Sequence, residues 1–281
     1  MHASRKALLC LLGPVVVAVV VAYVQWAAFG LPAVHAEALA PHRTGPYGFP
    51  AWLRVSHYLN FLFIVVLIRS GLQILMDHPR LYWNVHCTPG TEWVRFTPIE
   101  VPRDRVWTAK DDSRALTPWI GLPGGRHTLG LARHWHFATV VFWVLNGVVF
   151  YVLLFATGQW HRIVPTSWRV LPDAWAVFVH YATLHLPPEP DGFFQYNALQ
   201  RLAYFAAVFV LAPLSIVTGP SMSPALVNRF AWYTRLPGNR QIGRSIHFLI
   251  ACGWLAFVVA HVTMVALTGL ARNMNHIVLG T

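Results

Sequence analysis

The sequence predicts an all-α integral membrane protein, with a four-helix transmembrane bundle and one extra N-terminal transmembrane helix. Of its 281 residues, 56% are hydrophobic and only 11% are charged, a composition typical of helical membrane proteins. A helix needs about 20 mostly apolar residues to cross the hydrocarbon core of a bilayer. Five stretches reach or approach that length, at residues 7–31, 52–76, 135–158, 198–219 and 243–269.

The first stretch, within residues 1–36, is either a transmembrane helix or a signal segment. Basic residues precede its apolar run, and the sequence Val34-His35-Ala36 resembles the small-residue cleavage site of a secretory signal peptide. The apolar run is longer than the usual signal core, so we expect an uncleaved helix or signal anchor. Under both readings, the residues that follow lie outside the cytoplasm.

The net charge of +11 is better explained by membrane topology than by nucleic-acid binding, because the basic residues gather in alternate connections. Segment 77–133 holds eight Arg and Lys residues, and segment 220–244 holds four with no acidic residue. Both segments are therefore expected in the cytoplasm, together with the N-terminus. We expect a multi-pass protein of the bacterial inner (cytoplasmic) membrane, in contact with the lipid bilayer and with no nucleic-acid partner.

Two connections between the spans are long enough to carry structure of their own. Residues 77–134 are rich in Pro, Trp and Arg and show no long helical period, so they form either a partner-docking surface or an ordered cap on the helix ends. Residues 159–197 contain an amphipathic stretch that is too short to span, which predicts an interfacial helix. The pair Ser223-Pro224 predicts a helix start just beyond the fourth span.

Histidines in the apolar stretches are the strongest functional signal. The last stretch contains His247 and His261, which are 14 residues apart and therefore lie on one face of a helix. Polar rings inside a membrane are costly and usually functional. An R-x-x-H pattern also recurs at the start of three spans, in the pairs Arg54 and His57, Arg133 and His136, and Arg244 and His247.

The depth of these histidines in the membrane sorts them into two pairs. Because the last four spans alternate in direction, His57 shares a depth with His261, and His136 shares the other depth with His247. His134 points about 200° away from His136 around the helix, so only one of them can face a given cofactor. The arginine three residues earlier selects His136, because positions three apart are neighbours on a helix.

These histidine pairs predict two metal centres, and the metal we expect is haem iron. Two histidines without a nearby Cys or carboxylate leave four in-plane positions, which a porphyrin fills. The sequence has no C-x-x-C-H motif, so the haem is expected to be b-type and not covalently attached. We expect the arginines of the R-x-x-H pattern to pair with haem propionates. Gly71 and Gly147 fall on the same faces and would let the macrocycle approach the helices.

These residues resemble the di-haem membrane cytochrome b family. This b561-like family includes the b subunits of Ni–Fe hydrogenase, formate dehydrogenase and thiosulfate reductase. The resemblance covers roughly residues 50–275 and rests on RVSHYLN with RSGLQI, RHWHF with TGQW, YNALQRLAY with TGPSMSPAL, and GRSIHF with AHVTMV. It implies a four-helix cytochrome b domain with the same histidine pairing. The extra N-terminal segment would invert the orientation usual in that family, which leaves the side of partner docking open.

The function implied by the resemblance is that of an electron-transfer subunit without catalytic residues of its own. It would bind two haem b groups and pass electrons between a catalytic oxidoreductase subunit, often a molybdopterin enzyme, and the quinone pool. One alternative is a stand-alone b561-type quinone oxidoreductase that acts on a small soluble redox partner. Another is a haem-free structural anchor or transporter. The long 77–134 connection favours the subunit, because a stand-alone cytochrome has little need for it.

Overall fold

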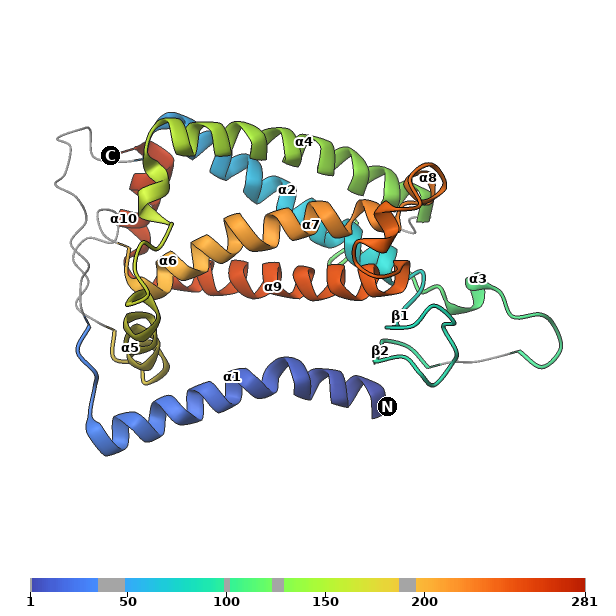
Figure 1. The fold of residues 1–281 in the computed structure, drawn as a ribbon, viewed down its shortest axis with the longest axis horizontal. Helices are drawn as coiled ribbons and strands as arrows, with labels where there is room; N and C mark the ends of the chain where they lie inside the picture. Colours follow the sequence, from blue (N-terminus) through green and yellow to red (C-terminus); the bar gives the residue numbers. More distant parts are fainter. Residues whose placement is uncertain (1, 35–48, 99–101, 123–128, 187–195, 281) are drawn as a thin grey trace. The chain divides into compact units, whose positions relative to one another are not determined.

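Five long apolar helical segments dominate the structure, as the sequence predicts. The computed structural model describes residues 2–34, 49–98, 102–122, 129–186 and 196–280 (Figure 1). Within these ranges, the segments long and apolar enough to cross a membrane are Leu12–Phe29, Ala51–Leu75, Gly130–Ala156, Ala198–Met222 and Arg240–Leu267. They belong to α1 (His2–Phe29), α2 (Ala51–Leu75), α4 (Leu129–Ala156), the segment that begins with α6 (Ala198–Phe205), and α9 (Arg240–Leu267). The chain is therefore a helical membrane protein.

Several helix boundaries differ from the predicted spans by a few residues, and the start of α4 and the end of α9 show why. Helix α4 begins at Leu129, six residues before the expected start, because hydropathy locates the hydrocarbon core and not the polar first turns of the helix. Helix α9 ends at Leu267 and is followed by Gly269, whose φ of 117° is a left-handed value that favours glycine. After this break come α10 (Leu270–Met274) and a short π-helix, η5 (Asn275–Leu279).

The fourth span is interrupted by a π-helix at its centre. After α6, the π-helix η2 (Ala206–Leu211) leads into α7 (Ala212–Thr218) and the 3₁₀-helix η3 (Pro220–Met222). Pro213 explains this break, because proline has no N–H to donate and its ring clashes with the carbonyl one turn earlier. The Tyr151 hydroxyl from α4 donates to the backbone carbonyl of Val208 within the π-helix.

The connections contain short elements, including a small sheet that the all-α prediction missed. The strands β1 (Arg80–Leu81) and β2 (Val94–Arg95) pair antiparallel, with Arg80 opposite Arg95, and α3 (Ala109–Asp112) follows. The predicted interfacial helix is present as α5 (Val170–Ala182), preceded by the 3₁₀-helix η1 (Gln159–Arg162). The predicted helix start is also present: Ser223 is the N-cap of α8 (Pro224–Arg229), although its side chain makes no capping hydrogen bond. The 3₁₀-helix η4 (Tyr233–Arg235) then precedes α9.

The chain divides into two compact units. The first comprises Met1–Leu9, Val55–Val149 and Leu214–Leu255, and its buried apolar cluster joins Leu75 of α2 to Leu81 and Val94 of the small sheet. The second comprises Cys10–Arg54, Phe150–Pro213 and Ala256–Thr281.

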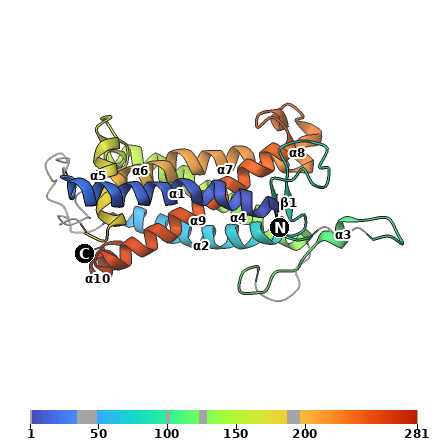
Figure 2. The ribbon, with the colours of Figure 1, turned by 90° about the horizontal axis from the view of Figure 1, so that it is seen from below.

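In the second unit, helices α1 and α5 are joined by a hydrogen bond. The Trp175 Nε1 atom donates to Gln25 Oε1 over 2.7 Å, and Figure 2 shows both helices. The predicted domain boundaries at 1–36 and 50–275 stay a prediction.

Candidate functional site

Helix α9 carries both histidines that the sequence analysis singled out. His247 and His261 lie in one unbroken helix, so their spacing of 14 residues keeps them on one face. In the first unit, the His247 Nδ1 atom lies 2.9 Å from the Oγ1 atom of Thr218, at the end of α7. A polar ring in an apolar helix thus has a hydrogen-bond partner on a neighbouring helix.

His136 on α4 has an equivalent partner on α2. Its Nδ1 atom lies 2.9 Å from the Oγ atom of Ser70. His134, two residues earlier, is exposed. The two histidines therefore have different surroundings, and the choice of His136 as a metal ligand stays a prediction.

Glycines lie beside both of these rings. A Cβ atom built on Gly71 would be 3.6 Å from the His136 Cε1 atom, and one built on Gly219 would be 3.6 Å from the His247 Cε1 atom. A Cβ atom on Gly147 would meet no atom within 4 Å. Gly71 thus lies next to the His136 ring, and its role beside a macrocycle stays a prediction.

Sequence reasoning missed Ser70, Thr218 and Gly219. A signal for them exists, because both hydroxyl residues are followed directly by the glycine that approaches the same histidine. The same hydroxyl–glycine dipeptide also occurs at Thr157-Gly158 and Thr268-Gly269. There the glycines have φ of 71° and 117° and lie where helices end, so the dipeptide alone does not identify a site.

The other predicted pair falls in different units. His57 belongs to the first unit, and His261 belongs to the second. Within the second unit, the His261 ring stacks on Phe257 with a centroid distance of 5.7 Å, and its Nδ1 atom lies 3.4 Å from the Tyr204 hydroxyl. The pairing of His57 with His261 stays a prediction from the sequence.

Two of the three predicted propionate-binding arginines donate to backbone carbonyls. Arg244 donates to the carbonyls of His78 and Arg80, and Arg54 donates to the carbonyl of Val278 over 2.9 Å. Arg133 is half-buried. The interaction of these arginines with propionates stays a prediction, and the structure adds a second role for Arg244, which holds the connection between α2 and α4.

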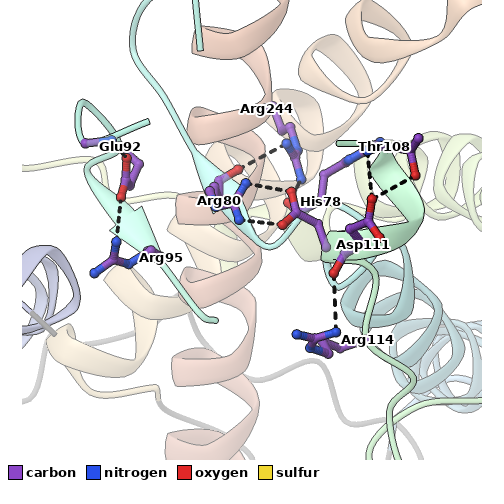
Figure 3. A network of polar contacts seen from close by, with 10 residues as sticks. His78, Arg80, Glu92, Arg95, Thr108, Asp111, Arg114 and Arg244 are labelled. Carbon is purple, nitrogen blue, oxygen red and sulfur yellow. Dashed lines mark hydrogen bonds and ion pairs between the residues drawn. The ribbon is translucent and has the colours of Figure 1, made fainter. Parts of the chain in front are cut away.

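The described part of that connection forms an ordered cap on the helix ends of the first unit, held by polar contacts (Figure 3). Arg80 and Asp112 form a buried bidentate ion pair with N–O distances of 2.6 and 2.5 Å. Arg105 pairs with Asp111, and this hydrogen bond, with a second from Thr108, holds the pKa of the Asp111 carboxyl well below its usual range. Whether this cap also docks a partner stays a prediction.

The donor set around His136 and His247 fits a haem better than a metal ion held by the protein alone. Among the described residues, no group of three or more His, Cys, Asp or Glu side chains could hold a metal ion. Each hydroxyl contact engages Nδ1, which leaves Nε2 available to bind a metal, and each ring lies beside a glycine that has no side chain. A porphyrin would supply the other ligands that such a metal needs.

The fold and these histidines define a multi-span membrane protein with hydrogen-bonded polar rings in its apolar helices. Residues 48–278 match the family described as Prokaryotic cytochrome b561, and the chain belongs to that family, which implies haem b as a cofactor. A relative from Azospira oryzae, described as "Putative protein-methionine-sulfoxide reductase subunit YedZ1", is 29% identical over 223 residues, which cover 78% of this chain and 89% of the relative. No solved structure matches the chain significantly. The resemblance inferred from the histidine motifs is therefore confirmed.

Proposed function

We propose that this cytochrome b561-type protein is an electron-transfer subunit that carries electrons between a catalytic partner and the quinone pool. The observation that carries the proposal is the pair of hydroxyl-bonded histidines, His136 and His247, each beside a glycine in an apolar helix. A haem held by two histidines would supply electron transfer and not oxygen binding. The chain itself holds the two rings through the hydroxyl groups of Ser70 and Thr218.

The proposal includes two haem b groups. His136 and His247 would hold the first, and their location in one unit supports this pairing. His57 and His261 would hold the second, which rests on the depth argument from the sequence. The family supports haem b without fixing the number of haems.

The catalytic partner is proposed to be a molybdopterin-type oxidoreductase. The Azospira oryzae relative is described as a subunit of a protein-methionine-sulfoxide reductase, which supports a partner that performs the substrate chemistry. The cap formed by residues of the long connection offers ordered structure outside the spans, where a soluble subunit could dock.

Haem content of the purified protein tests the haem assignment. A dithionite-reduced minus oxidised spectrum should show b-type absorbance with two haems per chain. His136→Ala and His247→Ala should each remove the same haem, whereas His57→Ala and His261→Ala should each remove the other. His134→Ala serves as the matched control and should retain both. A properly folded wild-type protein without b-type absorbance would refute the proposal.

Purification from the native membrane tests the subunit assignment. We expect a large catalytic subunit to copurify, and we expect a quinol to reduce the haems in the complex. Robust turnover of a small soluble reductant by the isolated chain, with no copurifying subunit, would instead support a stand-alone quinone oxidoreductase.

A further inference from the structure

We infer that the hydroxyl groups of Ser70 and Thr218 fix the ring tautomer of His136 and His247, and so prepare both ligands of one haem. This inference rests on the proposed function, because it concerns how the chain presents those ligands. Neither hydroxyl would touch the haem, so both are positioning residues. Each hydroxyl has a single proton, and the position of that proton determines whether the oxygen donates to the ring or accepts from it.

In α2, the Ser70 hydroxyl proton is committed to the helix backbone. The Oγ atom lies 2.6 Å from the Val66 carbonyl oxygen and 3.2 Å from that of Leu67. A contact of 2.6 Å between two oxygens requires a proton between them, and a hydroxyl has only one. At the 2.9 Å contact with His136, the Ser70 oxygen must therefore accept, and Nδ1–H must donate.

Thr218 repeats this arrangement on α7. Its Oγ1 atom donates to the Leu214 carbonyl over 2.7 Å, four residues earlier, so its proton is also committed. At the 2.9 Å contact with His247, the Thr218 oxygen must accept from Nδ1–H. Two different helices thus present the same hydrogen-bond acceptor to two different histidines.

The consequence is that each neutral ring carries its proton on Nδ1 and a lone pair on Nε2. Only the lone pair can bind iron, so the hydroxyls select the ligating tautomer before a haem arrives. An acceptor at Nδ1–H also fixes the ring orientation and raises the basicity of the ligand. Loss of the hydroxyl should therefore weaken haem binding and make the ligand a poorer donor to oxidised iron.

The test uses four variants and one control in the full-length chain. Ser70→Ala and Thr218→Val remove the acceptors, whereas Ser70→Thr and Thr218→Ser retain a hydroxyl. Thr157→Val is the matched control, because Thr157 also donates to a carbonyl four residues earlier, Leu153 over 2.6 Å, but contacts no histidine. The readouts are haem transfer to an excess of apomyoglobin, the midpoint potential of each haem, and the low-spin electron paramagnetic resonance spectrum.

We expect Ser70→Ala and Thr218→Val to weaken the binding of one haem about 10- to 100-fold and to raise its midpoint potential. The affected haem should be the one lost in His136→Ala and His247→Ala, and the other should be unchanged. Ser70→Thr and Thr218→Ser should restore wild-type values, and Thr157→Val should have no effect. Wild-type affinity and potential in both hydroxyl-free variants would overturn the inference, as would an equal effect in Thr157→Val. A wild-type protein without haem would instead refute the proposed function.

Discussion

The Trp93 indole N–H donates to the Ser245 hydroxyl oxygen over 2.9 Å, and Ser245 lies two residues before His247 on α9. The Ser245 hydroxyl in turn donates to the Tyr82 carbonyl over 2.8 Å, and Ser245 is fully buried. The cap is thus bonded to the helix that carries a proposed haem ligand. Ser245→Ala should lower the free energy of unfolding by about 1–3 kcal/mol, because it leaves a buried donor and acceptor without partners. Chemical unfolding in detergent measures this, and an unchanged midpoint would contradict it.

The ion pair of Arg80 and Asp112 should contribute strongly to the stability of the cap. Both side chains are at least 91% buried, so Asp112→Asn leaves the Arg80 charge without its partner in a dry environment. Loss of one partner of a buried pair costs about 3–5 kcal/mol. The control is Arg105→Ala, which breaks the pair with Asp111 at a side chain that is 54% exposed and should change stability little. Proteolysis of the cap compares them, and equal rates in the two variants would argue against this assignment.

The cap should loosen as the pH falls below neutral. Burial and, secondly, the Arg244 guanidinium lower the pKa of His78 from its ordinary value of 6.5. Protons therefore bind His78 more tightly when the cap is open than when it is closed. The closed cap has its full stability above pH 6.5, where His78 is neutral in both states, and it loses stability as the pH falls toward the lowered pKa. Hydrogen exchange of residues 78–96, corrected for the intrinsic pH dependence, measures the opening. His78→Gln should remove this pH dependence. If the pH dependence persists in that variant, another titratable group causes it.

The space beside His136 should tolerate a methyl group but not a large side chain. A Cβ atom at Gly71 would stand 3.6 Å from the ring, which is ordinary van der Waals contact. Gly71→Ala should therefore keep both proposed haems, whereas Gly71→Leu should displace the one proposed at His136, since the longer side chain would occupy the space that the macrocycle needs. Gly13→Leu provides a control, because a Cβ atom there meets nothing within 4 Å. Full haem content in Gly71→Leu would show that no macrocycle edge passes this glycine.

The π-helix in the fourth span should depend on Tyr151. Its hydroxyl donates to the Val208 carbonyl, and Tyr151→Phe removes that donor inside an apolar span. Hydrogen bonds of this kind contribute about 1 kcal/mol in membranes, so we expect a loss of that order in unfolding experiments. Tyr58→Phe, at a position that is 44% exposed, should have no effect. If both variants unfold alike, the hydrogen bond from Tyr151 to the Val208 carbonyl does not contribute to stability.

The spans could be predicted from the sequence because hydropathy over about 20 residues is a strong local signal. The π-helix η2 could not. Pro213 predicts a break in the helical hydrogen bonds, but several local backbone geometries can accommodate such a break. The π-helix that forms here is bonded to Tyr151, which belongs to another helix. The local sequence around Pro213 cannot predict that contact.

Part of the candidate site could also be predicted from local signals in the sequence. His136 and His247 stand out because polar rings are rare in apolar helices. Ser70 and Thr218 do not stand out, since Ser and Thr commonly bond to their own helix backbone and are tolerated in spans. Each of these residues is followed by a glycine, but the same hydroxyl–glycine dipeptide also occurs where α4 and α9 end. Only the packing of the helices shows which of these hydroxyl groups contact a histidine.

The hydrogen bond between Trp175 and Gln25 has a consequence for how the protein is made. It joins positions that are 150 residues apart in the chain. At a synthesis rate of about 5–20 residues per second, Gln25 is synthesised roughly 8 to 30 s before Trp175. During that interval, Gln25 must rely on lipid headgroups, water or the insertion machinery for its hydrogen bonds. Biogenesis therefore includes a late step in which an early helix is secured by a partner translated long after it.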